Sequence, residues 1–274
     1  MNPWYWIIPA LIVLIVFGMR LVHRRKDMSD DLWHAEMNLG RQAQVKRDLE
    51  NAVLHFKEAV SIAEKSGFED GRLEQSLNLL GLAYMESQDF DQARQVYEQQ
   101  LALEQRMGGS EGIPSTIALS NLSTVCRLQG NHTDAESYAG RAVQIIERSP
   151  GYGSEKLIPH LQNLGAAYLA QEKYAEAAGT FERTLPLIEQ KLGKWNPETV
   201  MVMNLLAESY LAQGSLQEAE SVYAGELAAL TIVDGEEDGS LLPVLEKYAS
   251  VLRRLGKTTE ADDADSRIER IRHK

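Results

Sequence analysis

An alanine recurs along this chain at an interval of about 42 residues, and this register constrains the fold more than any other feature. The alanines in register are Ala52, Ala93, Ala135, Ala177, Ala219 and Ala261. Twelve residues before each of these alanines stands another small or nearly small residue. These residues are Gly40, Gly81, Ser123, Gly165, Ala207 and Ala249. Self-similarity at a fixed period of about 20–50 residues is typical of stacked repeats. The sequence therefore predicts an array of six repeat units.

Each unit has the pattern of two helices. In the fourth unit, apolar residues recur three and four positions apart in Leu161, Leu164 and Tyr168, and again in Ala177 and Phe181. This spacing is typical of an amphipathic helix. A short polar connection separates the two runs, which suits an antiparallel helix hairpin. We therefore predict an all-α fold, a right-handed α-solenoid of about six antiparallel helix hairpins.

The small residues indicate where the two helices of a hairpin meet. Packed helices lie about 8–10 Å apart, depending on the side chains at the contact. Because small residues allow the closest approach, we expect each one to face the alanine that follows twelve positions later. A large side chain at either position would push the helices apart.

The residues in this register resemble the tetratricopeptide repeats. The family pattern of Leu-Gly, Tyr, Ala and an aromatic is matched by Leu80, Gly81, Tyr84, Ala93 and Tyr97. The resemblance covers about residues 32–272. It implies a fold of stacked hairpins and a surface that docks proteins or peptides.

The long period resembles one subgroup of this family, the repeats of kinesin light chains. In that subgroup a Gly-x-x-His-Pro-x-Thr linker precedes each hairpin. Residues 193–199 have the similar sequence GKWNPET, in which Asn196 replaces the His. No heptad coiled coil precedes the repeats, so the chain is not expected to be a kinesin light chain itself.

An apolar stretch precedes the repeats. Residues 4–22 contain one charged residue, Arg20, and are followed by Arg24, Arg25 and Lys26. About 20 apolar residues suffice to cross a membrane, and the basic flank is expected on the cytoplasmic side. We therefore predict a single-pass membrane protein with its short N-terminus outside and its repeats in the cytoplasm. A cleaved secretory signal is the alternative, although no basic residue precedes the stretch and no small-x-small site follows it.

These features predict two domains. Residues 1–28 form a transmembrane anchor with a basic cytoplasmic flank, and residues 29–274 form the solenoid. The repeats are expected at about residues 33–66, 74–107, 116–149, 158–191, 200–233 and 242–273. In the last hairpin, Asp265 stands where most other repeats have an aromatic, which is typical of a polar cap at the end of a solenoid.

Charge and composition exclude several function classes. The formal net charge is −12, and most of the acidic residues lie in the repeats. Proteins that bind nucleic acid need basic surfaces that displace counterions, so we predict no nucleic acid partner. The His residues are scattered without the spacing of metal ligands, and Cys126 occupies a column that holds Tyr in three other repeats. We therefore predict a protein that is not an enzyme and that binds no metal or cofactor.

Polar residues on the first helix of each hairpin are candidates for partner binding, because the family resemblance implies that these helices line the inner surface. An amide both donates and accepts hydrogen bonds, so it can pair with a partner's main chain. Hairpins about 10 Å apart would meet every third residue of an extended peptide, which rises about 3.3 Å per residue. The candidates are Asn38, Asn78, Asn121, Asn163 and Asn204, with Arg127, Arg253 and Arg254 as basic contacts for an acidic partner. The alternative is that these amides form hydrogen bonds within the solenoid or only keep its surface hydrated.

The carboxylate clamp with which some tetratricopeptide repeats grip chaperone tails is not expected. That clamp needs Lys and Arg beside Asn on the inner helices. At the matching position, six residues before the small residue, the chain has His34, Gln75, Ile117, Pro159, Met201 and Pro243. The absence of Lys from this position disfavours a receptor for chaperone tails.

Two functions remain compatible with the sequence. The first is a membrane-anchored adaptor or scaffold whose inner surface docks a protein or an extended peptide segment. The alternative is a structural assembly or self-association factor that braces a membrane complex, in which case a homo-oligomer is possible.

Overall fold

The computed structural model describes residues 28–67, 70–108, 112–149, 151 and 153–273. Within these residues every regular element is a helix and no strand occurs. The all-helical fold predicted from the repeat register is therefore confirmed. The chain divides into two compact units, Met1–Gly109 and Ser110–Lys274, and each is described by itself. The domain boundaries and the right-handed path of the solenoid stay predictions.

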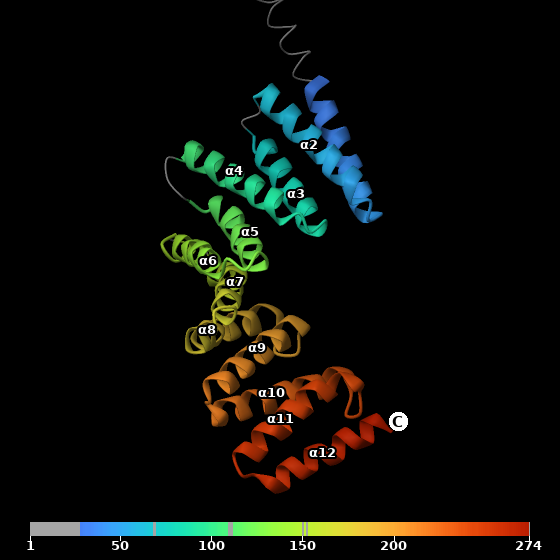
Figure 1. The fold of residues 1–274 in the computed structure, drawn as a ribbon, viewed down its shortest axis with the longest axis vertical. Helices are drawn as coiled ribbons and strands as arrows, with labels where there is room; N and C mark the ends of the chain where they lie inside the picture. The colour runs from blue at the N-terminus through green and yellow to red at the C-terminus, as the bar shows by residue number, and fades with distance from the viewer. Residues whose placement is uncertain (1–27, 68–69, 109–111, 150, 152, 274) are drawn as a thin grey trace, which may run out of the picture. The chain divides into compact units, whose positions relative to one another are not determined.

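Among its described residues, the first unit contains two pairs of antiparallel helices (Figure 1). Residues 28–45 are helical and precede α2 (Leu49–Ser66), while α3 (Arg72–Glu86) precedes α4 (Phe90–Gly108). Trp33 Nε1 donates a hydrogen bond of 2.8 Å to Ser76 Oγ, and Gln44 Nε2 donates one of 2.6 Å to Glu86 Oε1. These bonds join the first helices of the two pairs, which therefore lie side by side.

The second unit contains four pairs of helices among its described residues, and each helix packs against the next one along the chain. The helices are α5 (Ser115–Leu128), α6 (His132–Glu147), α7 (Ile158–Leu169), α8 (Tyr174–Leu192), α9 (Pro197–Gln213), α10 (Leu216–Asp234), α11 (Leu242–Arg254) and α12 (Thr258–Arg272). The short helices η1 (Ser154–Leu157) and η2 (Gly239–Leu241) precede α7 and α11. The first helices of the four hairpins are therefore α5, α7, α9 and α11.

Every hairpin turns at one residue with a positive φ angle. These residues occur at the same repeat position and are Arg47, Gln88, Gly130, Glu172, Gly214 and Gly256. Glycine adopts this conformation freely, whereas other residues lose about 1 kcal/mol or more in it. The turn geometry is therefore kept in all six hairpins, although only three of them have glycine there.

The glycine of the repeat register lies under an aromatic ring of the second helix. A Cβ atom added to Gly165 would stand 2.6 Å from Phe181 Cζ, and one added to Gly81 would stand 2.4 Å from Tyr97 Cε1. Both rings are fully buried. The small residue therefore lies against the aromatic four residues after the alanine, a contact that the spacing alone did not indicate.

The third hairpin has a different contact at the same repeat position. It has Ala139 in place of the aromatic, and its small residue is Ser123. Ser123 Oγ donates a hydrogen bond of 2.8 Å to the backbone oxygen of Ala135. A buried hydroxyl with a partner thus takes the place of the glycine and ring.

The predicted localisation as a single-pass membrane protein is wrong. In the part of the chain that the structure describes, no helix is long and apolar enough to cross a membrane. The longest helices bury one face only and carry charged residues on the other, as Glu182 and Arg183 of α8 show. Residues 4–22, on which the predicted transmembrane helix rested, lie outside the described residues.

Candidate binding surface

The first helices of the second unit lie next to one another and form its candidate binding surface. Asn163 Nδ2 on α7 donates a 3.4 Å hydrogen bond to the backbone oxygen of Ser120 on α5. Ser120 Oγ also lies 2.6 Å from His160 Nδ1. Further along, Lys247 on α11 forms an ion pair with Glu208 on α9. These contacts join residues about one repeat apart and hold the helices in register.

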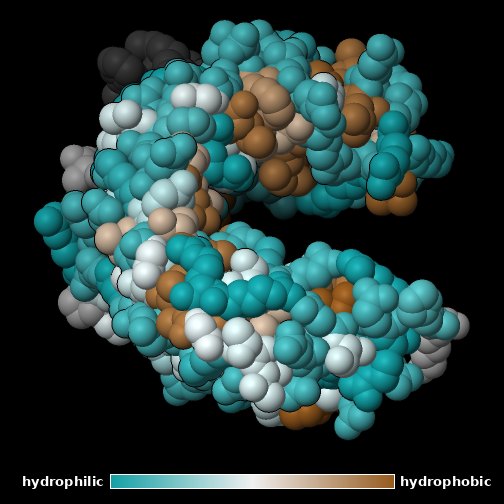
Figure 2. Space-filling view, turned by 60° about the horizontal axis from the view of Figure 1, so that its bottom comes forward, coloured by the Kyte–Doolittle hydropathy of each residue, from teal (hydrophilic) through white to brown (hydrophobic). Residues whose placement is uncertain are grey.

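Four apolar side chains occupy the same repeat position on these helices and are all exposed. Ile117 is 55% exposed and Met201 is 49% exposed, and Pro159 and Pro243 are exposed as well. Successive members are 42 residues apart. We call these four residues the apolar row. Figure 2 shows hydrophobic residues in separate patches on a mostly hydrophilic face of the molecule.

An asparagine follows three members of the apolar row by one helical turn. Asn121 stands four residues after Ile117, Asn163 four residues after Pro159, and Asn204 three residues after Met201. Side chains three or four positions apart lie on the same face of a helix. Each of α5, α7 and α9 therefore presents an apolar group beside an amide.

The structure places the five predicted asparagines in different surroundings. Asn163 and Asn204 donate hydrogen bonds within the second unit, and Asn204 Nδ2 lies 3.1 Å from Glu226 Oε1. Asn121 is half-buried on α5. Asn78 is half-buried and Asn38 is exposed, but both belong to the first unit. Three of the five therefore lie on first helices of the second unit, and partner binding by any of them stays a prediction.

The three predicted arginines also differ. Arg127 is half-buried in the last turn of α5, and Arg254 is exposed at the end of α11. Arg253 forms an ion pair with Asp265 on α12. Because Arg253 already neutralises a carboxylate of the same hairpin, it is a poor candidate for an acidic partner.

A buried carboxyl group behind the surface was not predicted from the sequence. Glu226 on α10 is only 2% exposed and accepts the hydrogen bond from Asn204. Burial raises the pKa of Glu226 to about 7, although the hydrogen bond from Asn204 and the nearby Lys247 act in the opposite direction. The sequence did contain a signal for this group. At the repeat position of Glu226, the two preceding hairpins have the uncharged residues Thr184 and Ala142.

The hydroxyl of Tyr223 lies in the same region. Among the described residues it has no hydrogen-bond partner, although the ring is fully buried. Burial raises the pKa of Tyr223, and the nearby Glu208 and Glu226 raise it further. The polar groups behind the surface therefore favour their uncharged forms.

His160 is a second buried titratable residue that the sequence did not single out. It stands at the repeat position that Ala118 and Val202 hold in the neighbouring hairpins. Its side chain is 7% exposed and lies against Ser120. Burial lowers the pKa of His160, because the charged imidazolium loses its hydration. The neutral ring thus serves as a hydrogen-bonding spacer between α5 and α7.

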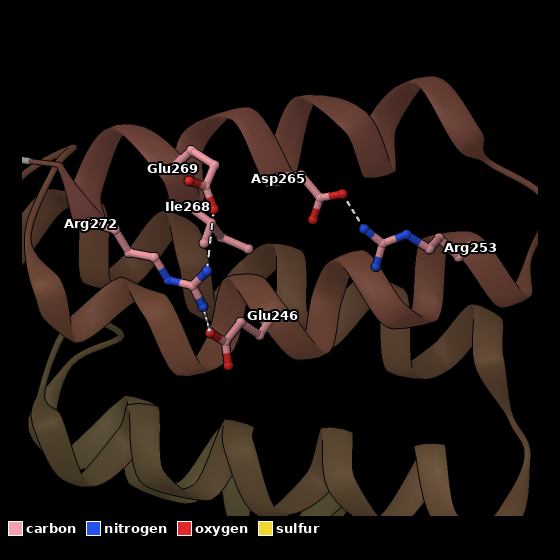
Figure 3. Close-up of a pocket in the computed structure, with 6 residues that line it drawn as sticks. All are labelled: Glu246, Arg253, Asp265, Ile268, Glu269 and Arg272. Atoms are coloured by element: carbon pink, nitrogen blue, oxygen red, sulfur yellow. Dashed lines mark hydrogen bonds and ion pairs between the residues drawn. The ribbon is translucent and has the colours of Figure 1, made fainter.

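A charged pocket of about 410 Å³ lies between α11 and α12. Figure 3 shows that its charges are paired: Arg253 points to Asp265, and Arg272 lies 2.7 Å from Glu246 and 3.3 Å from Glu269. Asp265, Glu269 and Arg272 stand where α10 has Tyr223, Leu227 and Leu230. The pocket is therefore the polar end of the last hairpin and not a ligand site.

The described residues offer no geometry for a metal. In the described ranges, no three His, Cys, Asp or Glu side chains lie close enough together to hold a metal ion. Cys126 is fully buried and packs with Ala135 and Ala167. The absence of enzymatic activity stays a prediction.

Comparison with known families identifies the repeat type. Sequence models of the tetratricopeptide repeat match residues 76–111, 115–190 and 163–231. Together these ranges extend from α3 into α10. None of the curated proteins matches the sequence.

Solved structures with the same fold come from several organisms. BtubC (BKLC) from P. vanneervenii is 20% identical, with 82% of this chain and 91% of that chain covered and a TM-score of 0.68. A putative kinesin light chain from Podosopora anserina is 21% identical, with coverage of 73% and 95% and a TM-score of 0.63. Pseudomonas aeruginosa pilF is 17% identical, with coverage of 89% and 93% and a TM-score of 0.60. At these identities the likeness shows the fold alone.

Proposed function

Because this chain is a tetratricopeptide-repeat protein, we propose that the first helices of its second unit dock an extended segment of a partner protein, without catalysis. The apolar row carries this proposal. Four exposed apolar side chains lie at one repeat position, whereas their neighbours in sequence, such as Ala118 and Val202, are buried. Exposed apolar groups aligned in this way are typical of an interaction site.

The spacing of the row sets the chemistry of the partner. Successive first helices are about 10 Å apart, and an extended chain rises about 3.3 Å per residue, so each hairpin meets every third residue. The partner segment should therefore carry an apolar side chain at every third position. Charged side chains at those positions would lose hydration against Ile117 and Met201 without gaining a counter-charge.

The amides beside the row bind the partner's main chain in this proposal. Asn163 and Asn204 use their amide nitrogens within the protein, which leaves the amide oxygens to accept hydrogen bonds. A main-chain N–H group is the donor that every partner residue except proline offers. The row thus selects apolar side chains, while the amides fix the path of the backbone.

The proposal is tested with an array of random peptides probed with the full chain. We expect binding to peptides with an apolar residue at every third position. Replacing Met201 by Glu should weaken that binding at least tenfold, because a carboxylate would replace an apolar contact in the middle of the row. Val233→Glu is the matched control, since Val233 is also exposed, at 51%, but lies at the end of α10.

Two outcomes would contradict the proposal. Peptides that bind the Met201→Glu variant as tightly as the unchanged chain would show that the ligand lies elsewhere. Equal losses in the Val233→Glu variant would indicate a general effect of negative charge and not a docking row.

A further inference from the structure

Two amides of the candidate binding surface are held by acceptors of different chemistry. Asn163 Nδ2 donates a hydrogen bond of 3.4 Å to the backbone oxygen of Ser120. Asn204 Nδ2 donates instead to the carboxyl group of Glu226, at 3.1 Å from Oε1 and 3.4 Å from Oε2. A backbone carbonyl accepts hydrogen bonds at every pH, whereas a carboxyl group gains a donor when it binds a proton. The orientation of the Asn204 amide therefore depends on the protonation state of its neighbour.

The ionised form of Glu226 fixes one orientation of the Asn204 amide. A carboxylate has no proton to donate, so the amide nitrogen and not the amide oxygen must face it. The oxygen is then left on the other arm of the amide, turned away from α10. Asn204 is half-buried, so part of its side chain stays accessible to a partner. In this orientation Oδ1 accepts a hydrogen bond from a main-chain N–H group.

The protonated form of Glu226 favours the opposite orientation. Its carboxyl group carries an O–H donor, and this donor needs an acceptor within the protein because the residue is only 2% exposed. Asn204 Oδ1 supplies that acceptor when the amide turns over about its Cβ–Cγ bond. The amide nitrogen then takes the outer position, where it meets a partner's N–H group donor to donor. Protonation thus exchanges an acceptor for a donor on α9.

The charged groups around Glu226 are engaged elsewhere. Glu208 on α9 and Lys247 on α11 form an ion pair with each other. Arg267 on α12 donates a hydrogen bond to a threonine hydroxyl further along α10. On α10 itself, the hydroxyl of Tyr223 has no hydrogen-bond partner among the described residues. The short helix η2, which also packs against α10, has no titratable side chain.

Among the described residues, Asn204 alone forms a side-chain hydrogen bond with Glu226. We propose that ionised Glu226 is a positioning residue of the docking surface, which turns the amide oxygen of Asn204 toward the main chain of the partner. This inference rests on the docking function proposed above. Because the partner then binds one protonation state better than the other, docking at α9 is coupled to the release of a proton.

The first test follows the side-chain amide signals of Asn163 and Asn204 by NMR in the full chain without a partner. Burial raises the pKa of Glu226 to about 7, so the Asn204 signal should shift between pH 6 and pH 8 with its midpoint there. The Asn163 signal is the internal control, because a backbone carbonyl holds that amide. In the Glu226→Gln variant the Asn204 signal should no longer titrate. An Asn204 signal that stays constant in the unchanged chain, or that titrates equally in the variant, overturns the proposal.

The second test measures docking of a peptide recovered from the array, blocked at both ends and free of residues that titrate between pH 6 and pH 8. The Kd should fall about tenfold from pH 6 to pH 8, because the ionised fraction of Glu226 rises by that factor. Glu226→Gln should bind equally at both pH values, since glutamine does not ionise. Glu218→Gln, on the exposed side of α10, is the control and should keep the pH dependence.

The outcomes separate this inference from the docking function on which it rests. Binding that Met201→Glu abolishes but that does not change with pH would contradict positioning by Glu226 and leave the docking function standing. A pH dependence that persists in Glu226→Gln would belong to another group and would overturn the inference too. Binding that survives Met201→Glu would contradict the docking function and the inference together.

Discussion

Replacing Gly165 by Val is expected to destabilise the second unit by about 3 kcal/mol, the upper range for overpacking in a protein core. Even a single Cβ at this position would stand 2.6 Å from the ring of Phe181. The ring is fully buried. Urea unfolding of the full chain, followed by circular dichroism, measures the change in the free energy of unfolding.

Gly179→Val provides the matched control in the same hairpin. Gly179 lies in α8, and a Cβ added there would meet nothing within 4 Å. Valine has a slightly higher helix propensity than glycine, so this variant should raise the free energy of unfolding by about 0.3 kcal/mol. Equal destabilisation by both variants would contradict the glycine and ring contact.

A double variant isolates the contact itself. Phe181→Ala alone leaves a cavity and should cost about 3–5 kcal/mol. The Val at position 165 would partly fill that cavity, so the two substitutions together should cost less than the sum of their separate effects. Additive losses would show that Gly165 and Phe181 do not act on each other.

Glu226→Gln is expected to stabilise the protein above pH 7 and to leave it unchanged below about pH 4. Burial raises the pKa of Glu226 from 4.5 to about 7, so the folded state keeps its proton over a range in which the unfolded state has lost it. The contribution of the protonated Glu226 carboxyl to the free energy of unfolding is complete below pH 4.5 and declines as the pH rises to 7. The loss is on the order of 3 kcal/mol, and glutamine avoids it because it does not ionise.

The measurement compares the free energy of unfolding of both proteins between pH 4 and pH 8. The difference between them removes the contribution of His160, which has the opposite sign: burial lowers its pKa, so its stabilisation is lost as the pH falls below 6.5. Glu218→Gln on the exposed side of α10 is the control and should leave the profile unchanged. A difference between Glu226→Gln and the original chain that is independent of pH would contradict the assignment.

The repeat register was sufficient to predict the helices, because it depends on packing within each hairpin. Gly81 and Gly165 lie against the rings of Tyr97 and Phe181, and each contact joins residues only 16 positions apart. The ring contact of the glycine was not predicted, since spacing alone does not show which way a large ring extends. Both residues of such a contact lie in the same repeat, so the sequence of one repeat contains the whole contact.

The asparagines show where prediction from one helix stops. The amide of Asn163 is directed by a backbone oxygen one hairpin earlier, and that of Asn204 by a buried carboxyl on the next helix. Neither partner can be identified from the helix that carries the asparagine. The apolar row was visible in the sequence, but its exposure follows only from how successive hairpins pack.

The central claim is that the apolar row docks one extended segment. It is tested most directly by placing a photocrosslinking amino acid in turn at positions 117, 159, 201 and 243 of the full chain and mapping the crosslinked residues by mass spectrometry. The account predicts that all four positions reach the same segment of one partner, in consecutive order and about three residues apart. Crosslinks to unrelated partners, or to sites without this order, would contradict it.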